Sequence, residues 1–331
     1  MINTKLQLHT DILDPEKLEK AATRDGFGKG LVEAGEKDER IMALCADLAE
    51  STRAHWFKEK FPERYVELGV AEQNLMAVAS GLANYGKIPF AMSYAAFSPG
   101  RNWEQIRSTV ALNDVPVKII GAHAGVSVGP DGATHQALED IATMRVLPNM
   151  IVIVPADSEE ARKATLAIAI NDKPSYLRLA RAKTPIFTTA ETLFEIGVPQ
   201  VVYKPENPTV GVIACGSLVY QSILAASELS KEGIHISVMN LSTIKPMNEK
   251  MVTEFAQNVD HIVTAEEHQI HGGMGSAVAE VLGKHAPTKM SFIGMEDRYG
   301  ESGDPDQLLE HFGFTKSGII EHIKHQLKKE N

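Results

Sequence analysis

The sequence predicts an α/β protein made of two doubly wound domains, each built on a mostly parallel sheet. Apolar runs of strand length alternate with longer amphipathic segments along the chain. The runs are almost continuously apolar, which is typical of parallel strands covered by helices on both faces. The chain has 331 residues, of which 44% are hydrophobic and 23% charged, enough for two domains with substantial cores.

The strands and helices are expected to alternate in regular order. Strands are expected at residues 40–47, 87–93, 116–123, 150–156, 175–181, 209–216, 234–241, 261–267 and 289–294. Helices are expected at residues 16–36, 71–86, 103–113, 157–171, 218–232, 248–258, 273–285, 305–312 and 317–328. Asp157 begins one helix as a capping side chain, followed by two glutamates that suit the first turn.

A proline-rich interval divides the two series of elements. Residues 182–208 contain Pro185, Pro199, Pro205 and Pro208 and have no sustained hydrophobic period. We therefore expect a first domain at residues 1–187, a linker at 188–208 and a second domain at 209–331.

The charge and the two cysteines restrict the class of protein. The net charge is −10 without any basic block, which argues against nucleic acid or a membrane surface as a partner. Cys45 and Cys215 lie in apolar segments and are expected to be buried free thiols in a reducing compartment. The first residues do not resemble a signal peptide, and no apolar stretch has the length of a membrane span, so a cytoplasmic location is expected.

Three other motifs give weak signals. RDGFGKG (24–30) lies within a helix-like segment, where a dinucleotide fingerprint is not expected. GGMGSAVAE (272–280) could hold an anion at a helix N-terminus, although a tight packing turn is the preferred interpretation. EEHQIHGG (266–273) has two histidines but no second ligand pair, so we expect no metal site on this chain.

The loop GAHAGVSVGPDGATHQ (121–136) carries the strongest chemical signal. It follows an apolar strand, and ligands of open α/β sheets bind at the carboxyl ends of strands. His123, Asp131 and His135 all lie on this loop. Each could be a local structural residue, but together they indicate a polar ligand.

Several segments together resemble the transketolase family. GVAEQN (69–74) is followed by DGATHQALEDIATMRVLPNMIVIVPAD (131–157) in the family's order and separation. Further similarity extends over nearly the whole chain, in ATR (22–24), CADLAEST (45–52), SYAAFSPGRNWEQIR (93–107), IKP (244–246), EEHQIHGG and RYGESG (298–303). The chain looks like the C-terminal section of a split transketolase, with a pyrimidine-binding domain followed by a C-terminal domain.

The resemblance implies thiamine diphosphate as the cofactor. Glu72 matches the glutamate that hydrogen-bonds the pyrimidine ring and activates the cofactor. Apolar packing around Glu72 would remove water and favour its protonated form. Asp47 looks like the acid that supports the cofactor site near the subunit boundary.

Aromatic residues are implied on either side of the pyrimidine. Tyr94 and Phe97 resemble the side chains that stack on its ring. Ser98-Pro99-Gly100 departs from the family where a further aromatic residue is usual, and Trp103 is the expected substitute.

The same resemblance implies a site for a sugar phosphate. His123 and His135 would hydrogen-bond the sugar and shuttle protons, and Asp131 would bind the C2 hydroxyl of the acceptor aldehyde. The terminal phosphate would be held by Arg24, Ser51 and Arg181, since the planar fork of arginine suits a tetrahedral anion. The expected reaction moves a two-carbon ketol unit from a ketose phosphate, or a similar anionic ketose, to an aldose phosphate.

A partner chain is expected because one family motif is missing. The family binds the diphosphate and its Mg²⁺, or another divalent cation, through a GDG motif in an N-terminal domain, and this sequence has no GDG. We expect an N-terminal-section transketolase subunit as the partner, in an α2β2 heterotetramer.

Three alternatives remain open at this stage. The fold and length also suit the β subunit of a 2-oxoacid dehydrogenase decarboxylase, although Arg24 and Arg181 favour a sugar phosphate. A 1-deoxyxylulose-5-phosphate synthase-like enzyme normally keeps both halves on one chain. A regulatory or scaffold half without cofactor is opposed by the joint presence of Glu72, His123, Asp131 and His135.

Overall fold

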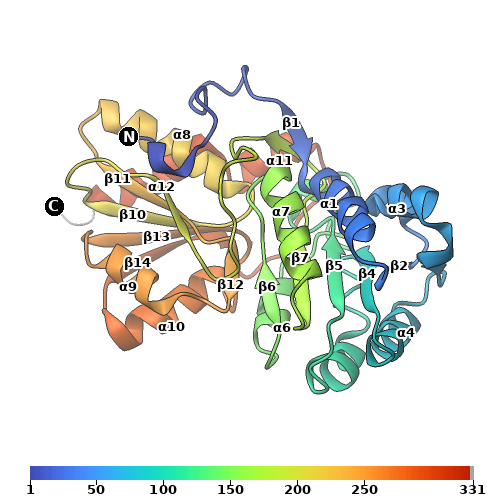
Figure 1. Cartoon of the computed structure of the whole chain (residues 1–331). Helices are drawn as coiled ribbons and strands as arrows, with labels where there is room; N and C mark the ends of the chain where they lie inside the picture. Colours follow the sequence, from blue (N-terminus) through green and yellow to red (C-terminus); the bar gives the residue numbers. More distant parts are fainter. Residues whose placement is uncertain (329–331) are drawn as a thin grey trace.

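Two mostly parallel sheets with helices on their faces form the protein (Figure 1). The structure is a computed structural model that describes residues 1–328. The α/β architecture predicted from alternating apolar and amphipathic segments is confirmed.

The first sheet contains seven strands in the order β12-β6-β7-β5-β4-β2-β3. All neighbours are parallel except β12 and β6. The strands are β2 (Ile41–Cys45), β3 (Tyr65–Glu67), β4 (Ile88–Tyr94), β5 (Lys118–Ala122), β6 (Ile151–Ile153), β7 (Ser175–Arg178) and β12 (Thr243–Lys245). The carboxyl ends of the parallel strands therefore meet along one edge of the sheet.

The second sheet has the order β14-β13-β10-β11-β9, with only β9 antiparallel to its neighbour. Its strands are β9 (Gln200–Tyr203), β10 (Val210–Ala214), β11 (Ile236–Asn240), β13 (His261–Gln269) and β14 (Lys289–Met295). The short strands β1 (Lys20–Ala22) and β8 (Lys183–Pro185) form a separate antiparallel pair. β9 lies within 188–208, so part of the interval expected as a linker is a strand of the second sheet.

The nine expected helices lie close to their predicted positions, with one clear difference at the N-terminus, and three short helices at 49–52, 54–60 and 140–145 were not predicted. They are α1 (Thr23–Lys37), α2 (Ala49–Thr52), α3 (Ala54–Lys60), α4 (Glu72–Asn84), α5 (Trp103–Gln105), α6 (Asp140–Arg145), α7 (Ser158–Ala169), α8 (Leu218–Lys231), α9 (Glu249–Ala256), α10 (Met274–His285), α11 (Pro305–His311) and α12 (Lys316–Lys328). The helix expected from residue 16 begins only at Thr23, because residues 20–22 pair as β1. Asp25 then accepts the N–H of Ala22 at 3.2 Å and caps the helix start.

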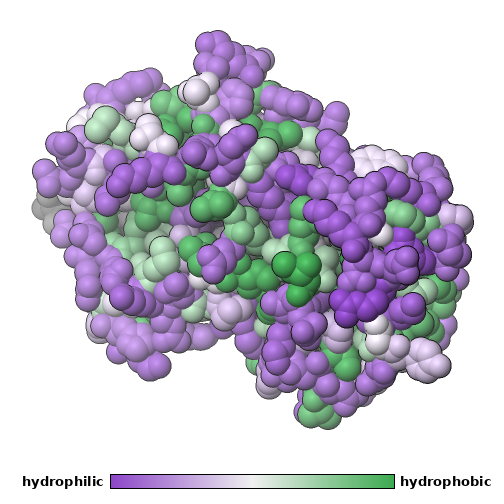
Figure 2. Space-filling model, in the orientation of Figure 1, coloured by the Kyte–Doolittle hydropathy of each residue, from purple (hydrophilic) through white to green (hydrophobic). Residues whose placement is uncertain are grey.

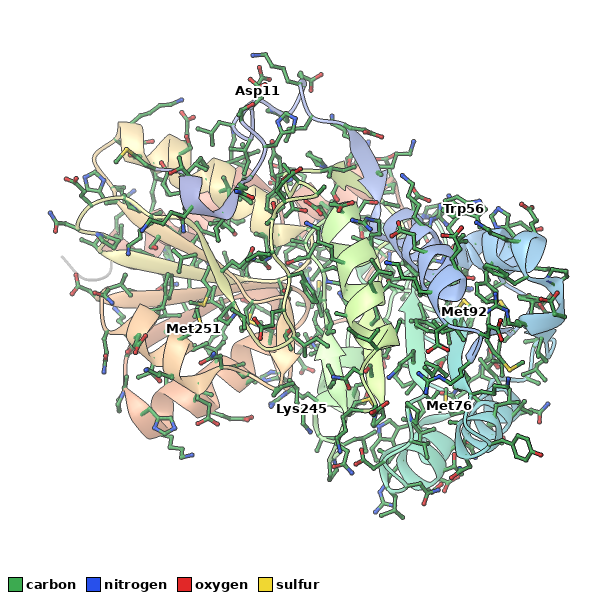
Figure 3. All side chains as sticks on the ribbon, in the orientation of Figure 1. Asp11, Trp56, Met76, Met92, Lys245 and Met251 are labelled. Carbon is green, nitrogen blue, oxygen red and sulfur yellow. The ribbon has the colours of Figure 1, made fainter. Side chains whose placement is uncertain are left out.

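The glycines of RDGFGKG serve the packing of α1. A Cβ on Gly26 would lie 1.7 Å from the carbonyl oxygen of Ser158 at the start of α7, and a Cβ on Gly28 would lie 2.6 Å from Trp56 of α3. Figure 3 labels Trp56 beside α1. Close helix contact, and not phosphate binding, accounts for these glycines.

Alternate residues of the first sheet face opposite helix layers. Phe90 and Met92 of β4 pack in a buried cluster with α1, α3 and α7. Ala91 points the other way, into a cluster with Leu75 of α4.

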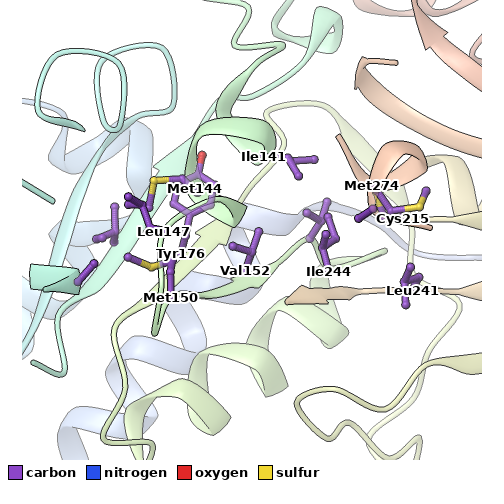
Figure 4. Close-up of a cluster of buried hydrophobic side chains, with 14 of the residues drawn as sticks. Ile141, Met144, Leu147, Met150, Val152, Tyr176, Cys215, Leu241, Ile244 and Met274 are labelled. Atoms are coloured by element: carbon purple, nitrogen blue, oxygen red, sulfur yellow. The ribbon is translucent and has the colours of Figure 1, made fainter. Parts of the chain in front are cut away.

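One hydrophobic cluster continues from the first sheet into the second. Figure 4 shows Val152 and Tyr176 of the first sheet in the same cluster as Cys215, Leu241 and Met274. The two units thus share a core, which fixes the C-terminal unit against the first sheet. Figure 2 shows hydrophobic side chains gathered in the middle of one face, with hydrophilic ones on both flanks. Within residues 1–328, no helix combines the length and apolarity needed to cross a membrane.

Candidate active site

The predicted site residues gather at the carboxyl edge of the first sheet. Asp47 and Ser51 follow β2, and Tyr94 ends β4. His123 follows β5, and Arg181 lies just beyond β7. Parallel pairing of these strands brings side chains that are far apart in sequence to one edge.

Glu72 is the first residue of α4 and is only 4% exposed. Nη1 of Arg101 lies 3.2 Å from each of its carboxylate oxygens. The side-chain amide of Asn102 donates to the backbone oxygen of Glu72 at 3.0 Å. The Glu72 side chain is therefore buried, as predicted, with the guanidinium of Arg101 directly beside its carboxylate.

Four rings form a cluster next to Arg101. The ring centroids of Tyr94 and Phe97 are 6.1 Å apart with planes at 28°. His123 meets Tyr94 edge-on at 4.2 Å, and His135 meets Phe97 at 5.2 Å. Trp103, expected to join the aromatic residues, instead packs against the shared core and donates its indole N–H to the carbonyl oxygen of Thr143 at 2.9 Å.

His123 is 2% exposed and adopts a positive φ of 55°. Its Nε2 lies 2.8 Å from Nη1 of Arg24. Burial, followed by the charges of Arg24 and Arg181, lowers the pKa of His123 to about 3. Its Nδ1 is buried without a hydrogen-bond partner among residues 1–328, so the hydrogen-bonding capacity of this atom is unused within the described chain.

Two of the residues predicted to bind the terminal phosphate, Arg24 and Arg181, place positive charge near His123. Nη1 of Arg24 donates to the backbone oxygen of Ser51 at 3.0 Å. Arg181 donates to the backbone oxygen of Val128 at 2.5 Å and lies 3.9 Å from the carboxylate of Asp131. Burial lowers the pKa of Arg24, and so does the positive charge of Arg53. The side chain of Arg53 bonds Asp25 at 2.6 Å, and no sequence signal marked it.

The C-terminal unit holds the loop that carries His135 and Asp131. Ser127 donates its backbone N–H to Glu267 at 2.5 Å, and burial raises the pKa of Glu267. Gln136 donates to the backbone oxygen of Glu301 at 2.8 Å. The EEHQIHGG and RYGESG segments therefore support the loop. These supporting side chains were not predicted, since their role depends on contacts between the two units.

The N-terminus of α10 is already occupied by a side chain of the chain itself. Glu266 accepts the N–H groups of Met274 and Gly275 at 2.7 and 2.8 Å. The tight-turn interpretation of GGMGSAVAE thus agrees with the structure, and a free anion site there does not. Across residues 1–328, no group of three or more His, Cys, Asp or Glu side chains could hold a metal ion.

Asp47 lies at the outer rim of the site. It is exposed, has a φ of 61°, and donates its backbone N–H to Glu67 at 2.8 Å. Glu67 also accepts the hydroxyl of Tyr65 at 2.6 Å and the N–H of Gly69 at 3.0 Å. This network fixes the turn that leads from β3 to Glu72.

The chain matches two family models and several known proteins. Residues 19–186 match the transketolase pyrimidine-binding domain and residues 200–319 the transketolase C-terminal domain. A Methanocaldococcus jannaschii protein named "Putative transketolase C-terminal section" is 41% identical, covering 93% of this chain and 96% of its own. The 6-deoxy-6-sulfo-D-fructose transketolase subunit SqwH of a Clostridium species is 38% identical over 92% of this chain and 94% of its own. A solved structure titled "Split gene transketolase, inactive beta4 tetramer" shares 41% identity and a TM-score of 0.85, covering 93% and 98% of the two chains.

The fold and both matched models define a transferase of the transketolase type. The chain belongs to the transketolase family, and it corresponds to the C-terminal section of a split transketolase. The prediction of a transketolase enzyme is confirmed. The roles of individual site residues stay predictions.

Proposed function

We propose that this chain transfers a two-carbon ketol unit from a ketose phosphate, or a similar anionic ketose, to an aldose phosphate, as one subunit of a thiamine-diphosphate-dependent enzyme. One observation carries the proposal. An unbroken series of contacts links Glu72 to Arg24 through Arg101, Phe97, Tyr94 and His123. The series thus runs from a buried acid to flat aromatic rings, and then to a neutral histidine and clustered cations. This order suits a cofactor ring at one end and an anionic sugar at the other.

The residues at one end of this series fit the pyrimidine of thiamine diphosphate. Glu72 is buried at the start of α4 and can hydrogen-bond a ring nitrogen. Tyr94 and Phe97 offer nearly parallel ring planes to a flat heterocycle. When bound, this cofactor supplies a nucleophilic carbon that attacks the ketose carbonyl.

The histidines suit the reacting end of the sugar. Arginine only donates hydrogen bonds, so Nε2 of His123 accepts from Arg24 and its Nδ1 carries the proton. This N–H faces no partner among the described residues and can donate to a substrate oxygen. His135, which contacts Phe97 at 5.2 Å, would bind the sugar and shuttle protons, and Asp131 would bind the acceptor's C2 hydroxyl.

The cationic group suits the far end of an anionic sugar. Arg24, Arg53 and Arg181 each contribute positive charge at His123. A terminal phosphate held by Arg24, Ser51 and Arg181 would relieve the repulsion between these charges. A sulfonate has similar shape and charge, and one relative is named for a sulfonated ketose.

The diphosphate end of the cofactor is assigned to a partner chain. This sequence lacks the GDG motif, so the N-terminal-section subunit would bind the diphosphate and its Mg²⁺ or other divalent cation. The exposed position of Asp47 at the rim supports a subunit boundary there. An α2β2 heterotetramer in the cytoplasm is the proposed state. The three similar proteins described above carry transketolase names, which favours this interpretation over the 2-oxoacid dehydrogenase and deoxyxylulose-phosphate synthase alternatives.

The test is reconstitution of the two-chain enzyme. The chain is co-expressed with an N-terminal-section partner and assayed with thiamine diphosphate, Mg²⁺ and a panel of phosphorylated, sulfonated and uncharged ketoses. Glu72→Gln should abolish ketol transfer while the complex still assembles, whereas the exposed Glu59→Gln should keep full activity. Unchanged turnover in Glu72→Gln would refute the assignment.

A further inference from the structure

Arg101 makes two contacts that the proposed function gives to the cofactor. Its Nη1 lies 3.2 Å from both oxygens of Glu72. Its guanidinium carbon lies 4.2 Å from the centroid of the Phe97 ring. The planar guanidinium of Arg101 thus hydrogen-bonds Glu72 and covers one face of the Phe97 ring at the same time.

A guanidinium and an aminopyrimidine are alike in these respects. Both are planar, both can donate N–H groups to a carboxylate, and both stack on aromatic rings. Phe97 also has ring contacts with Tyr94 at 6.1 Å and with His135 at 5.2 Å. A pyrimidine stacked on the face of Phe97 beside Glu72 must displace the guanidinium of Arg101 that covers it.

The backbone of Arg101 is held in place while its side chain is half in solvent. The backbone N–H of Arg101 donates to the backbone oxygen of Phe97 at 2.8 Å. The backbone oxygen of Arg101 accepts from the side-chain amide of Gln73 at 3.3 Å. The side chain of Arg101 is 51% exposed, whereas that of Glu72 is 4% exposed. The guanidinium can therefore turn outward without disturbing the segment, but Glu72 cannot follow it.

We propose that Arg101 is a positioning residue that stands in for the pyrimidine of the cofactor. In the free chain it holds the carboxylate of Glu72 in place, and it turns into solvent when the cofactor binds. This inference rests on the proposed function. Loading the cofactor is then an exchange of one planar donor for another at Glu72.

The test is calorimetric titration of the reconstituted two-chain enzyme with thiamine diphosphate and Mg²⁺. Arg101→Gln should tighten cofactor binding about tenfold, because no ion pair to buried Glu72 has to be broken. Arg101→Lys keeps the charge but not the planar fork, so it should bind the cofactor with an affinity between those of wild type and Arg101→Gln. Arg107→Gln, an exposed arginine on the same segment, is the matched control and should behave as wild type.

Two results would overturn the inference: weaker cofactor binding in Arg101→Gln than in wild type, or equal affinities of the two proteins. These results differ from a failure of the proposed function. In that case the wild-type complex itself would bind no thiamine diphosphate, or Glu72→Gln would keep full activity.

Discussion

Nη1 of Arg24 lies 2.8 Å from Nε2 of His123, so a cation donates to the ring of a buried histidine. The contact fixes the tautomer of His123, because only an unprotonated Nε2 can accept this bond. It joins the cationic end of the site to the aromatic cluster, since the same ring meets Tyr94 edge-on at 4.2 Å.

His123 should therefore stay neutral over the whole physiological range. Its pKa of about 3 lies far below the ordinary 6.5, with burial as the largest cause and Arg24 next. Nitrogen NMR of the labelled chain should show His123 protonated on Nδ1 only, unchanged from pH 5 to 8. Arg24→Gln should raise the pKa of His123 but leave it below 6.5, because burial persists. A full titration of His123 near pH 6.5 in the wild-type chain would contradict the geometry.

Phe97 should contribute to cofactor affinity and little to stability. Phe97→Leu removes the aromatic face while keeping apolar volume, so the affinity of the assembled enzyme for thiamine diphosphate should fall about two- to tenfold. Calorimetric titration measures this change. Phe61→Leu, in the α3 region and in ring contact with Phe57, is the control, which should leave cofactor affinity unchanged. Equal affinities in wild type and Phe97→Leu would remove Phe97 from the cofactor site.

Local patterns in the sequence predicted much of the fold. The nine expected strands all occur, because near-continuous apolar runs such as that of β5 are buried on both faces. The short strands β1, β3, β8, β9 and β12 were not predicted, since three or four residues carry too little periodicity. The start of α1 was placed too early because a tertiary pairing, β1 with β8, overrode the helical pattern.

Residues of the site could be predicted only where they lie in a recognisable sequence motif. One loop after a strand carries His123, Asp131 and His135. Glu72 lies in GVAEQN, a motif that resembles the transketolase family. Arg101 lies in a segment that resembles the family and Arg53 directly follows one, but no sequence pattern indicated a role for either residue. Arg101 contacts Glu72, and Arg53 contacts Asp25. These pairs are far apart in sequence and meet only in the folded chain.

Gly26 should be intolerant of any side chain. A Cβ there would lie 1.7 Å from the carbonyl oxygen of Ser158, so Gly26→Ala must push α1 away from α7. Urea unfolding should show a loss of about 1–3 kcal/mol or more. Gly81→Ala is the matched control, because Gly81 lies in α4 with no atom within 4 Å of a Cβ. That variant should gain about 0.5–1 kcal/mol from helix propensity. A neutral Gly26→Ala would show that α1 and α7 do not pack this closely.

Glu160 should make the stability of the chain depend on pH. It is buried between the two units, where it accepts the N–H of Ala156 at 2.6 Å and the amide of Asn240 at 2.8 Å. Burial raises the pKa of Glu160 from 4.5 to about 7. Between these values the folded chain holds a proton that the unfolded chain has released. The free energy of unfolding should therefore fall as the pH rises from 4.5 through 7.

Glu160→Gln isolates this contribution, because glutamine cannot release a proton. Over the same window, its unfolding free energy should fall less steeply than that of wild type, by up to about 1.4 kcal/mol per pH unit. Part of the slope should remain, since burial also raises the pKa of neighbouring Asp157. Urea unfolding at pH 5, 6 and 7 measures the slopes, with exposed Glu59→Gln as the control. Parallel curves for wild type and Glu160→Gln would mean that Glu160 is ionised in the folded chain, and that the two hydrogen bonds it accepts outweigh its burial.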